Sequence, residues 1–324
     1  MPRPFDPLLS VVVPCFNEQE VLRETHRRLS AALRGLRVDY EIVYVDDGSR
    51  DETPAILREL QSSDGRVRVV RFSRNFGHQV AVTAGMDHAA GDAVVLIDAD
   101  LQDPPEVIAD LLARWRDGYD VAYGRRTERE GETAFKRATA SLFYRVLRAL
   151  TPVDIPSDTG DFRLMDRAVV EALRRMPEQD RFVRGMVSWV GFRQTAVPYR
   201  REARFAGVSK YPVRRMLRLA SDAIVSFSPL PLRLASYAGL ATIAAGLLAT
   251  AAVLGFAAAT RSLPTAAAVG LAVALVLGGV QLSAIGLLGE YVSRIYRQVQ
   301  GRPLYVVRET SGFGGEPEAL DRAA

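Results

Sequence analysis

Residues 93–106 read AVVLIDADLQDPPE. The apolar run Ala93–Ile97 is followed by three aspartates, Asp98, Asp100 and Asp103, and then by two prolines. Five consecutive apolar residues bounded by polar ones are typical of a buried strand, here Ala93–Ile97. The carboxylates that follow repel one another, so a cluster of this kind normally has a positive partner. The stretch therefore predicts a strand that delivers acids to a site where a cation is held.

The same alternation of short apolar runs and helical spacing recurs along the first 125 residues. It predicts right-handed crossovers and a largely parallel sheet, that is, a Rossmann-like α/β domain. Ligands bind such sheets at the carboxyl ends of the strands. The predicted strands are Leu9–Val13, Tyr40–Val45, Val67–Phe72, Ala93–Ile97 and Val121–Tyr123.

Polar residues follow each predicted strand, so five strand ends should form one polar rim. The motif Asp98-Ala99-Asp100 at this rim has two interpretations: a Mg²⁺ or Mn²⁺ site that holds a diphosphate, or a helix cap with a neighbouring surface acid. Mg²⁺ prefers oxygen ligands and usually takes one or two carboxylates together with phosphates and water. Asp100 and the amide oxygen of Gln102 could supply such a sparse shell, and Asp103 could instead cap the helix that starts with the prolines.

Composition limits the function classes. The net charge of +4 is too small to argue for nucleic acid, and no nucleic-acid-binding signature is present. The single cysteine, Cys15, excludes an internal disulfide framework and fits a reducing compartment. The first residues lack the charge and length of a secretory leader, and the run Leu8–Val13 is better interpreted as a strand.

Two long stretches, Leu234–Ala259 and Thr265–Gly289, contain no charged residue, and each exceeds the roughly 20 residues that cross a bilayer. Only five residues separate them, so they predict a hairpin of two transmembrane helices; the alternative is a buried helix pair in a soluble domain. Arginines are more numerous before and after the hairpin than in its turn. The positive-inside rule therefore predicts a multi-pass protein of the plasma (inner) membrane with the large domain and both termini in the cytoplasm.

Two further segments, 133–150 and 211–227, combine arginines with apolar residues at helical spacing. Such helices either cover an ordinary protein surface or lie on an anionic bilayer face, and their place before the hairpin favours the bilayer. The predicted organisation begins with a catalytic domain (1–210) and a juxtamembrane amphipathic helix (211–232). Two transmembrane helices (233–292) and a cytoplasmic tail (293–324) follow.

Six motifs occur in a fixed order before the hairpin: VVVPCFNEQE (11–20), YVDDGSRDET (44–53), NFGHQVAVTAG (75–85), DADLQDPPE (98–106), TGDFRLMDR (159–167) and AGVSKY (206–211). Together they resemble the polyprenyl-phosphate glycosyltransferases of glycosyltransferase family 2, which include bactoprenol glucosyltransferases and dolichyl-phosphate mannose synthases. The resemblance implies a GT-A fold. It also implies transfer of a sugar from a nucleotide diphosphate to a lipid phosphate, with inversion at the anomeric carbon.

The resemblance also implies roles for particular residues. Asp100 and Gln102 would hold the metal, Asp100 thereby acting in catalysis, and Asp161 would be the general base, with Asp158 as its competitor. His78, which follows a glycine at a helix start, is expected to be structural, and a turn-forming role is the alternative for Asp47. The nucleotide-sugar would contact Pro14, Phe16, Glu18, Asp47, Asn75, Asp98 and Lys210. The acceptor phosphate would contact Arg125, Arg137 and Ser141.

The expected reaction is transfer of a hexose, glucose from UDP-glucose, to undecaprenyl phosphate by a homo-oligomeric membrane enzyme. GDP-mannose is the alternative donor, and a membrane-anchored nucleotide-sugar sensor without activity is the non-enzymatic alternative. A processive polysaccharide synthase would share the front half of the chain. It would normally carry a Gln-x-x-Arg-Trp stretch, and residues 178–185, EQDRFVRG, lack the tryptophan.

Overall fold

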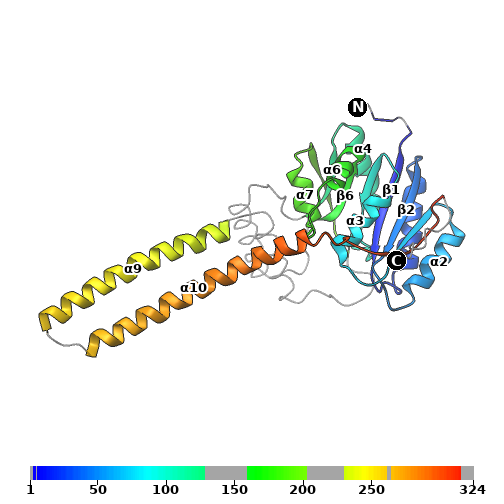
Figure 1. Ribbon diagram of the computed structural model, residues 1–324. Helices are drawn as coiled ribbons and strands as arrows, with labels where there is room; N and C mark the ends of the chain where they lie inside the picture. Colours follow the sequence, from blue (N-terminus) through cyan, green and yellow to red (C-terminus); the bar gives the residue numbers. More distant parts are fainter. Residues whose placement is uncertain (1–2, 5, 128–158, 203–229, 261–263, 315–324) are drawn as a thin grey trace. The chain divides into compact units, whose positions relative to one another are not determined.

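The computed structural model describes residues 3–4, 6–127, 159–202, 230–260 and 264–314 (Figure 1). The chain divides into two compact units, one built around a β-sheet and one containing two long helices. Residues 303–314 belong to the sheet unit, although they follow the long helices in sequence. The two units are described separately below.

The elements of the sheet unit follow the alternation that the sequence predicts, with three further strands. Its strands are β1 (Leu8–Cys15), β2 (Asp39–Asp46), β3 (Val67–Phe72), β4 (Ala93–Leu96), β5 (Val121–Arg126), β6 (Thr159–Asp166), β7 (Gln194–Tyr199) and β8 (Val307–Ser311). Its helices are α1 (Leu22–Gly35), α2 (Thr53–Ser63), α3 (His78–His88), the short 3₁₀ helix η1 (Pro105–Val107), α4 (Ile108–Arg116), α6 (Arg167–Arg174) and α7 (Val183–Trp189).

The eight strands form one sheet in the order β7-β5-β6-β4-β1-β2-β3-β8. Neighbours β1–β2, β1–β4, β2–β3 and β5–β7 are parallel, whereas β6 runs antiparallel to β4 and β5, and β8 runs antiparallel to β3. The prediction of a mostly parallel α/β sheet is confirmed. The first five predicted strands are present within three residues of their expected ends, and β6, β7 and β8 were not predicted.

Helices cover both faces of the sheet (Figure 1). Apolar side chains of α1, α2 and α4 share one buried core with alternate residues of the central strands, for example Leu29 with Val11 and Tyr44. On the other face, α3 packs so closely on β1 that a Cβ at Gly85 would lie 2.1 Å from a methyl carbon of Val12. Burial on both faces explains why these strands read as continuous apolar runs.

Strand direction decides which residues reach the polar rim. The carboxyl ends of β1 to β5 and β7 lie at one edge of the sheet, because all of these strands run the same way. Since β6 and β8 run the opposite way, it is their first residues that lie at this edge. The rim therefore includes Asp161 near the start of β6 and Arg308 near the start of β8.

The second unit consists of α9 (Leu230–Thr260) and α10 (Pro264–Val299), which lie side by side (Figure 1). Gly246 of α9 lies against Leu277 of α10, where a glycine permits close approach. Among the described residues, one helical segment, Val276–Val299, is long and apolar enough to cross a membrane, and Gly239–Leu248 is a shorter apolar stretch. Two long adjacent helices are thus present, and the crossing of a membrane by both of them stays a prediction.

Candidate functional site

The loops after β1, β2 and β3 are tied together by side chains that bond to the backbone. Asp46 accepts a hydrogen bond from the amide of Ser49 at 2.9 Å, a turn-forming role of the kind considered for its neighbour Asp47. Gly48 has φ of +67°, and a Cβ there would lie 2.4 Å from the carbonyl carbon of Arg74. The glycine thus lets the second loop approach the third, which no other residue type would permit without strain.

Asp47 is buried and holds the start of α3. One carboxylate oxygen accepts from the amide of Phe76 at 2.6 Å, and the other accepts from Gly77 at 3.0 Å. Burial raises the pKa of Asp47, and the two backbone amides counteract that rise. Asp47 therefore places His78, the residue after Gly77, over the rim.

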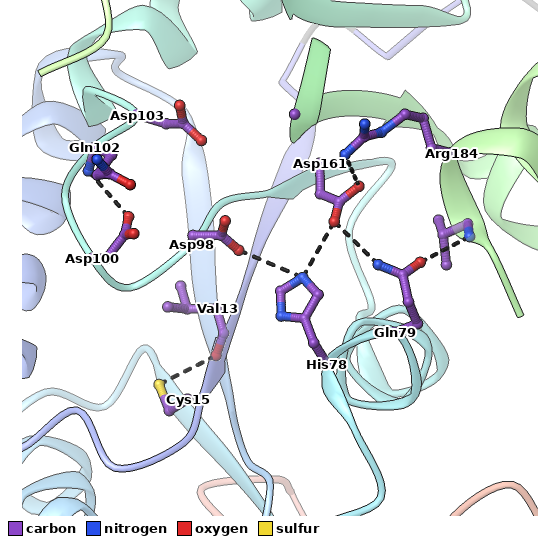
Figure 2. Close-up of polar contacts among 12 residues, drawn as sticks. Val13, Cys15, His78, Gln79, Asp98, Asp100, Gln102, Asp103, Asp161 and Arg184 are labelled. Carbon is purple, nitrogen blue, oxygen red and sulfur yellow. Dashed lines mark hydrogen bonds and ion pairs between the residues drawn. The ribbon is translucent and has the colours of Figure 1, made fainter. Parts of the chain in front are cut away.

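Asp161 is the centre of the polar cluster at this rim (Figure 2). Its Oδ2 atom lies 3.2 Å from His78 Nε2 and accepts from Gln79 Nε2 at 3.1 Å. Its Oδ1 atom accepts from Arg184 Nη2 at 3.2 Å. Gln79 also accepts, through Oε1, from the amide of Val183 at 2.9 Å, so α3 and α7 are joined at the carboxylate.

The cluster carries mixed charge. Burial alone would raise the pKa of the Asp161 carboxyl, but Arg184 and His78 outweigh it and hold that pKa well below its ordinary value. Burial would lower the pKa of His78, yet Asp161 and Asp98 raise it to about 9. His78 is therefore an imidazolium at neutral pH and donates to Asp161, an ionised carboxylate with weak basicity.

Asp98, directly after β4, is the second carboxylate that faces His78, with its Oδ1 atom 3.7 Å from Nε2. Burial raises the pKa of Asp98 to about 6; His78 opposes the rise, while the neighbouring acids add to it. Two acids, one after β4 and one on β6, therefore flank a cation, in line with the expectation that a carboxylate cluster has a positive partner.

Asp100 and Gln102 occupy one tight turn (Figure 2). The amide of Gln102 donates to Asp100 Oδ1 at 3.1 Å, and Leu101 between them has φ of +57°. The Gln102 side-chain oxygen accepts from Arg201 Nη2 at 2.6 Å. Within the described ranges, no group of three His, Cys, Asp or Glu side chains could hold a metal ion. The donor set fits a cation bound through few protein oxygens and through substrate phosphates, with Asp100 as the protein carboxylate.

Asp103 does not cap a helix. It is buried, and its Oδ1 atom accepts from the hydroxyl of Tyr199 at the end of β7. Arg126 Nη2 lies 3.8 Å from the same carboxylate, and Arg126 Nε lies 3.3 Å from the Tyr199 hydroxyl. The 3₁₀ helix instead begins after Pro104 without a side-chain cap, because the carboxylate turns inward to the sheet.

Arg125, the predicted acceptor residue, is exposed at the carboxyl end of β5, and its neighbour Arg126 points to Asp103. Adjacent strand residues face opposite sides, so the two arginines cannot share one role. Arg125 stays a prediction. The other predicted contacts Arg137, Ser141 and Lys210, and the alternative base Asp158, lie outside the described residues.

The predicted nucleoside contacts lie around the ends of β1 to β3. Pro14 and Asp47 are buried, Phe16 and Glu18 are partly buried, and Asn75 is exposed. Phe16 and Asn75 line one cavity of about 400 Å³. Cys15, next to them, is buried, and burial raises the pKa of its thiol.

The model of the family "Glycosyl transferase family 2" matches residues 10–174, which include β1 to β5, the Asp98–Asp100 turn and Asp161. The chain belongs to this family. It is a glycosyltransferase with a GT-A fold, as its motifs predicted.

Relatives of this glycosyltransferase match over nearly the whole chain. An uncharacterized glycosyltransferase of Bacillus subtilis (strain 168) is 50% identical over 304 residues, 94% of each chain. A prophage-derived bactoprenol glucosyl transferase of Shigella flexneri is 40% identical over 306 residues, 93% of this chain and 98% of that one. A crystal structure of glucosyl-3-phosphoglycerate synthase from Mycobacterium tuberculosis aligns with a TM-score of 0.48 at 22% identity, covering 67% of this chain and 77% of that one.

Sequence reasoning missed several residues of the glycosyltransferase site. His78 was assigned a structural role, whereas it lies between Asp98 and Asp161. Gln79 and Arg184 were not singled out, because their link to Asp161 spans 82 and 23 residues of sequence. The only local signal was a polar pair, His78-Gln79, at the start of an otherwise apolar helix that follows a parallel strand.

Proposed function

We propose that this glycosyltransferase transfers glucose from UDP-glucose to a polyprenyl phosphate, undecaprenyl phosphate, at the cytoplasmic face of the plasma membrane, with inversion. The observation that carries the proposal is the extent of the match to the bactoprenol glucosyl transferase. That match covers 93% of the chain, so it includes the long helices as well as the sheet. A relative that matched only the sheet unit would support use of a nucleotide-sugar donor, but not transfer to a lipid.

The donor would lie across the rim from β3 to β4. Asp98 and Asp47 would contact the nucleoside and ribose, and Asp100 would hold a Mg²⁺ or Mn²⁺ ion beside the diphosphate. When bound, such an ion neutralises charge on the leaving diphosphate. Gln102 could join it through the second lone pair of the side-chain oxygen that accepts from Arg201.

The acceptor is an anion, so it needs cations more than a base. A phosphate monoester carries about −1.5 to −2 charges at neutral pH and is already nucleophilic. The depressed pKa of Asp161 makes this carboxylate a weak proton acceptor. We therefore infer that Asp161 holds Arg184 and His78 in place as cations beside the reacting groups, and its role as general base remains only a prediction. Arg125, with Arg137 and Ser141, would bind the acceptor phosphate.

The long helices would anchor the protein in the bilayer that holds the lipid acceptor. Large apolar side chains are exposed along both helices, among them Leu247 on α9 and Leu282 on α10. Exposed apolar surface of this extent fits a lipid environment. We propose that both helices cross the membrane, with the sheet unit and both chain ends in the cytoplasm. We also propose that the enzyme is a homo-oligomer.

A turnover assay tests the proposed function. Purified full-length protein in detergent receives undecaprenyl phosphate, a divalent cation and radiolabelled UDP-glucose, and GDP-mannose in a parallel reaction. The proposal predicts labelled lipid from UDP-glucose and much less from GDP-mannose. The reverse preference would favour the mannosyltransferase alternative, and binding of either donor without lipid product would favour the sensor.

A further inference from the structure

One cavity of the sheet unit, about 400 Å³ in volume, is rich in arginines. It lies between the loops after β1, β2 and β3 and the start of β8. Its lining includes Phe16 together with Arg50, Arg71, Arg74 and Arg308. The guanidinium groups of these arginines can only donate hydrogen bonds, and they are the charged groups of the lining.

Only one of these arginines is neutralised by acids among the described residues. Arg71 Nε lies 3.2 Å from Asp46 Oδ2, and Arg71 Nη1 lies 3.7 Å from Glu309 Oε2. Arg74 stacks over the ring of Phe76 at 4.0 Å and donates to the carbonyl of Asn75. Within the described part of the chain, no carboxylate pairs with Arg50, Arg74 or Arg308, so their donors can serve a ligand.

Arg308 reaches the cavity through a β-bulge. In the β3–β8 ladder, Arg71 pairs with Glu309 and Phe72 pairs with Val307, so Arg308 is the extra residue between the two pairs. A bulge re-aims a side chain and is common beside binding sites.

The two residues just before the bulged strand, Tyr305 and Val306, are held in place by contacts with β3 and its loop and with α3. Tyr305 stacks on Phe72, with 5.0 Å between the ring centroids, and its hydroxyl lies 2.9 Å from Asp87 Oδ2. The amide of Ser73 donates to the carbonyl of Val306 at 3.0 Å. Arg308 is therefore a placed residue, carried by the segment that follows α10.

The distance from the acid cluster identifies the part of the donor that the cavity could take. In the sheet order, β3 is three strands and β8 four strands from β4. At about 4.8 Å per strand, these separations are roughly 14 and 19 Å. A diphosphate beside Asp100, after β4, would thus lie far from the β3 and β8 side of the cavity, while the base at the other end of the nucleotide could reach that side.

We propose that Arg308 is a specificity-determining residue of the nucleoside subsite expected in this cavity, and that it selects bases carrying a keto oxygen. The proposal rests on the proposed nucleotide-sugar donor. Phe16 offers a ring on which a base can stack. Arginine donates only, so it matches the O6 of guanine or the O4 that uracil shares with thymine, and it mismatches the amino groups of adenine and cytosine.

Nucleotide binding to the full-length protein tests the proposal. The affinities of UDP and CDP, which differ in one exocyclic group, are measured by calorimetry without lipid acceptor, with GDP and ADP as a second pair. We expect the unaltered protein to bind UDP at least about tenfold more tightly than CDP, the effect of one charge-assisted hydrogen bond. Arg308→Ala should lower UDP affinity about tenfold and leave CDP affinity within about twofold. Arg308→Lys, which keeps the charge but loses the planar fork, should fall between them.

The matched control is Arg58→Ala, which removes an arginine from α2 that does not line the cavity and should change neither affinity. Equal losses for UDP and CDP in Arg308→Ala would mean that Arg308 senses only phosphate charge, and would overturn the proposal, as would unchanged affinities. Arg308→Lys keeps the test decisive if Arg308→Ala unfolds. Because no acceptor is present, a keto preference without lipid product would contradict the proposed reaction and leave this inference intact.

Discussion

His78 Nε2 lies 3.2 Å from Asp161 Oδ2, although 83 residues separate the two in sequence. The contact joins the start of α3 to the start of β6, and on its other side His78 faces Asp98. The His78 cation thus lies between Asp98, which follows β4, and Asp161, which belongs to the antiparallel strand β6. This arrangement lets both acids remain at the rim of the sheet.

Replacing His78 by glutamine should lower turnover about tenfold to hundredfold, because the cation between the two carboxylates is lost while the hydrogen-bonding shape is kept. The measurement is the steady-state rate with UDP-glucose and lipid phosphate. His26→Gln is the control, since His26 contacts Tyr44 and lies in α1. Equal rates for His78→Gln and the unaltered enzyme would show that this cation has no part in transfer.

The same histidine should make stability depend on pH. The pKa of His78 is raised to about 9 from an ordinary value of 6.5, so its stabilising effect is complete below 6.5 and disappears as pH rises through 9. We expect the gap in thermal midpoint between the unaltered protein and His78→Gln to be largest at pH 6 and to close by pH 10. A gap that stays constant or widens with pH would contradict the assigned charge.

Arg125 and Arg126 are neighbours that should behave differently. Arg125→Ala should raise the KM for lipid phosphate more than the KM for the donor, and leave stability unchanged, because its side chain is exposed. Arg126→Ala should destabilise the protein by about 2 kcal/mol, because buried Asp103 loses its cationic partner. Thermal unfolding and two-substrate kinetics on both variants check the contrast. A larger donor effect in Arg125→Ala would remove it from the acceptor site.

The close approach of the β2 and β3 loops should depend on Gly48. Gly48→Ala forces a left-handed backbone onto alanine and drives its Cβ into Arg74, at a cost of about 3 kcal/mol. Gly35→Ala is the matched control: nothing lies within 4 Å of its Cβ, and in a helix the change should stabilise by about 0.5 kcal/mol. Unfolding midpoints of the two variants should therefore move in opposite directions.

Much of the fold is predictable from the sequence because its central strands are buried on both faces. Continuous apolar runs such as Ala93–Leu96 can be recognised as strands from the sequence alone. β6 is different: Arg163 is buried in the middle of it and donates to the carbonyls of Gly160 and Asp161. A buried arginine interrupts the apolar pattern, and β8 follows the long helices, where a sheet strand is unexpected.

The site was predictable only where its residues follow a predicted strand. Asp98 and Asp100 come directly after β4, so the sequence places them at the rim. The partners of Asp161 are determined by the packing of α3 and α7 against β6. Local sequence patterns do not predict such contacts. Asp103 shows the same limit, since its partner Tyr199 lies 96 residues further along the chain.

The most direct test of the account is the structure of the lipid product and its dependence on Asp100. Purified enzyme, UDP-glucose, undecaprenyl phosphate and Mg²⁺ or Mn²⁺ are incubated, and the anomeric configuration of the product is read by NMR. The account predicts a β-linked glucosyl phosphate lipid from the α-linked donor. It also predicts at least about a thousandfold less product from Asp100→Ala, but full activity from Asp110→Ala on the exposed face of α4. An α-linked product, or near-normal product formation by folded Asp100→Ala, would contradict it.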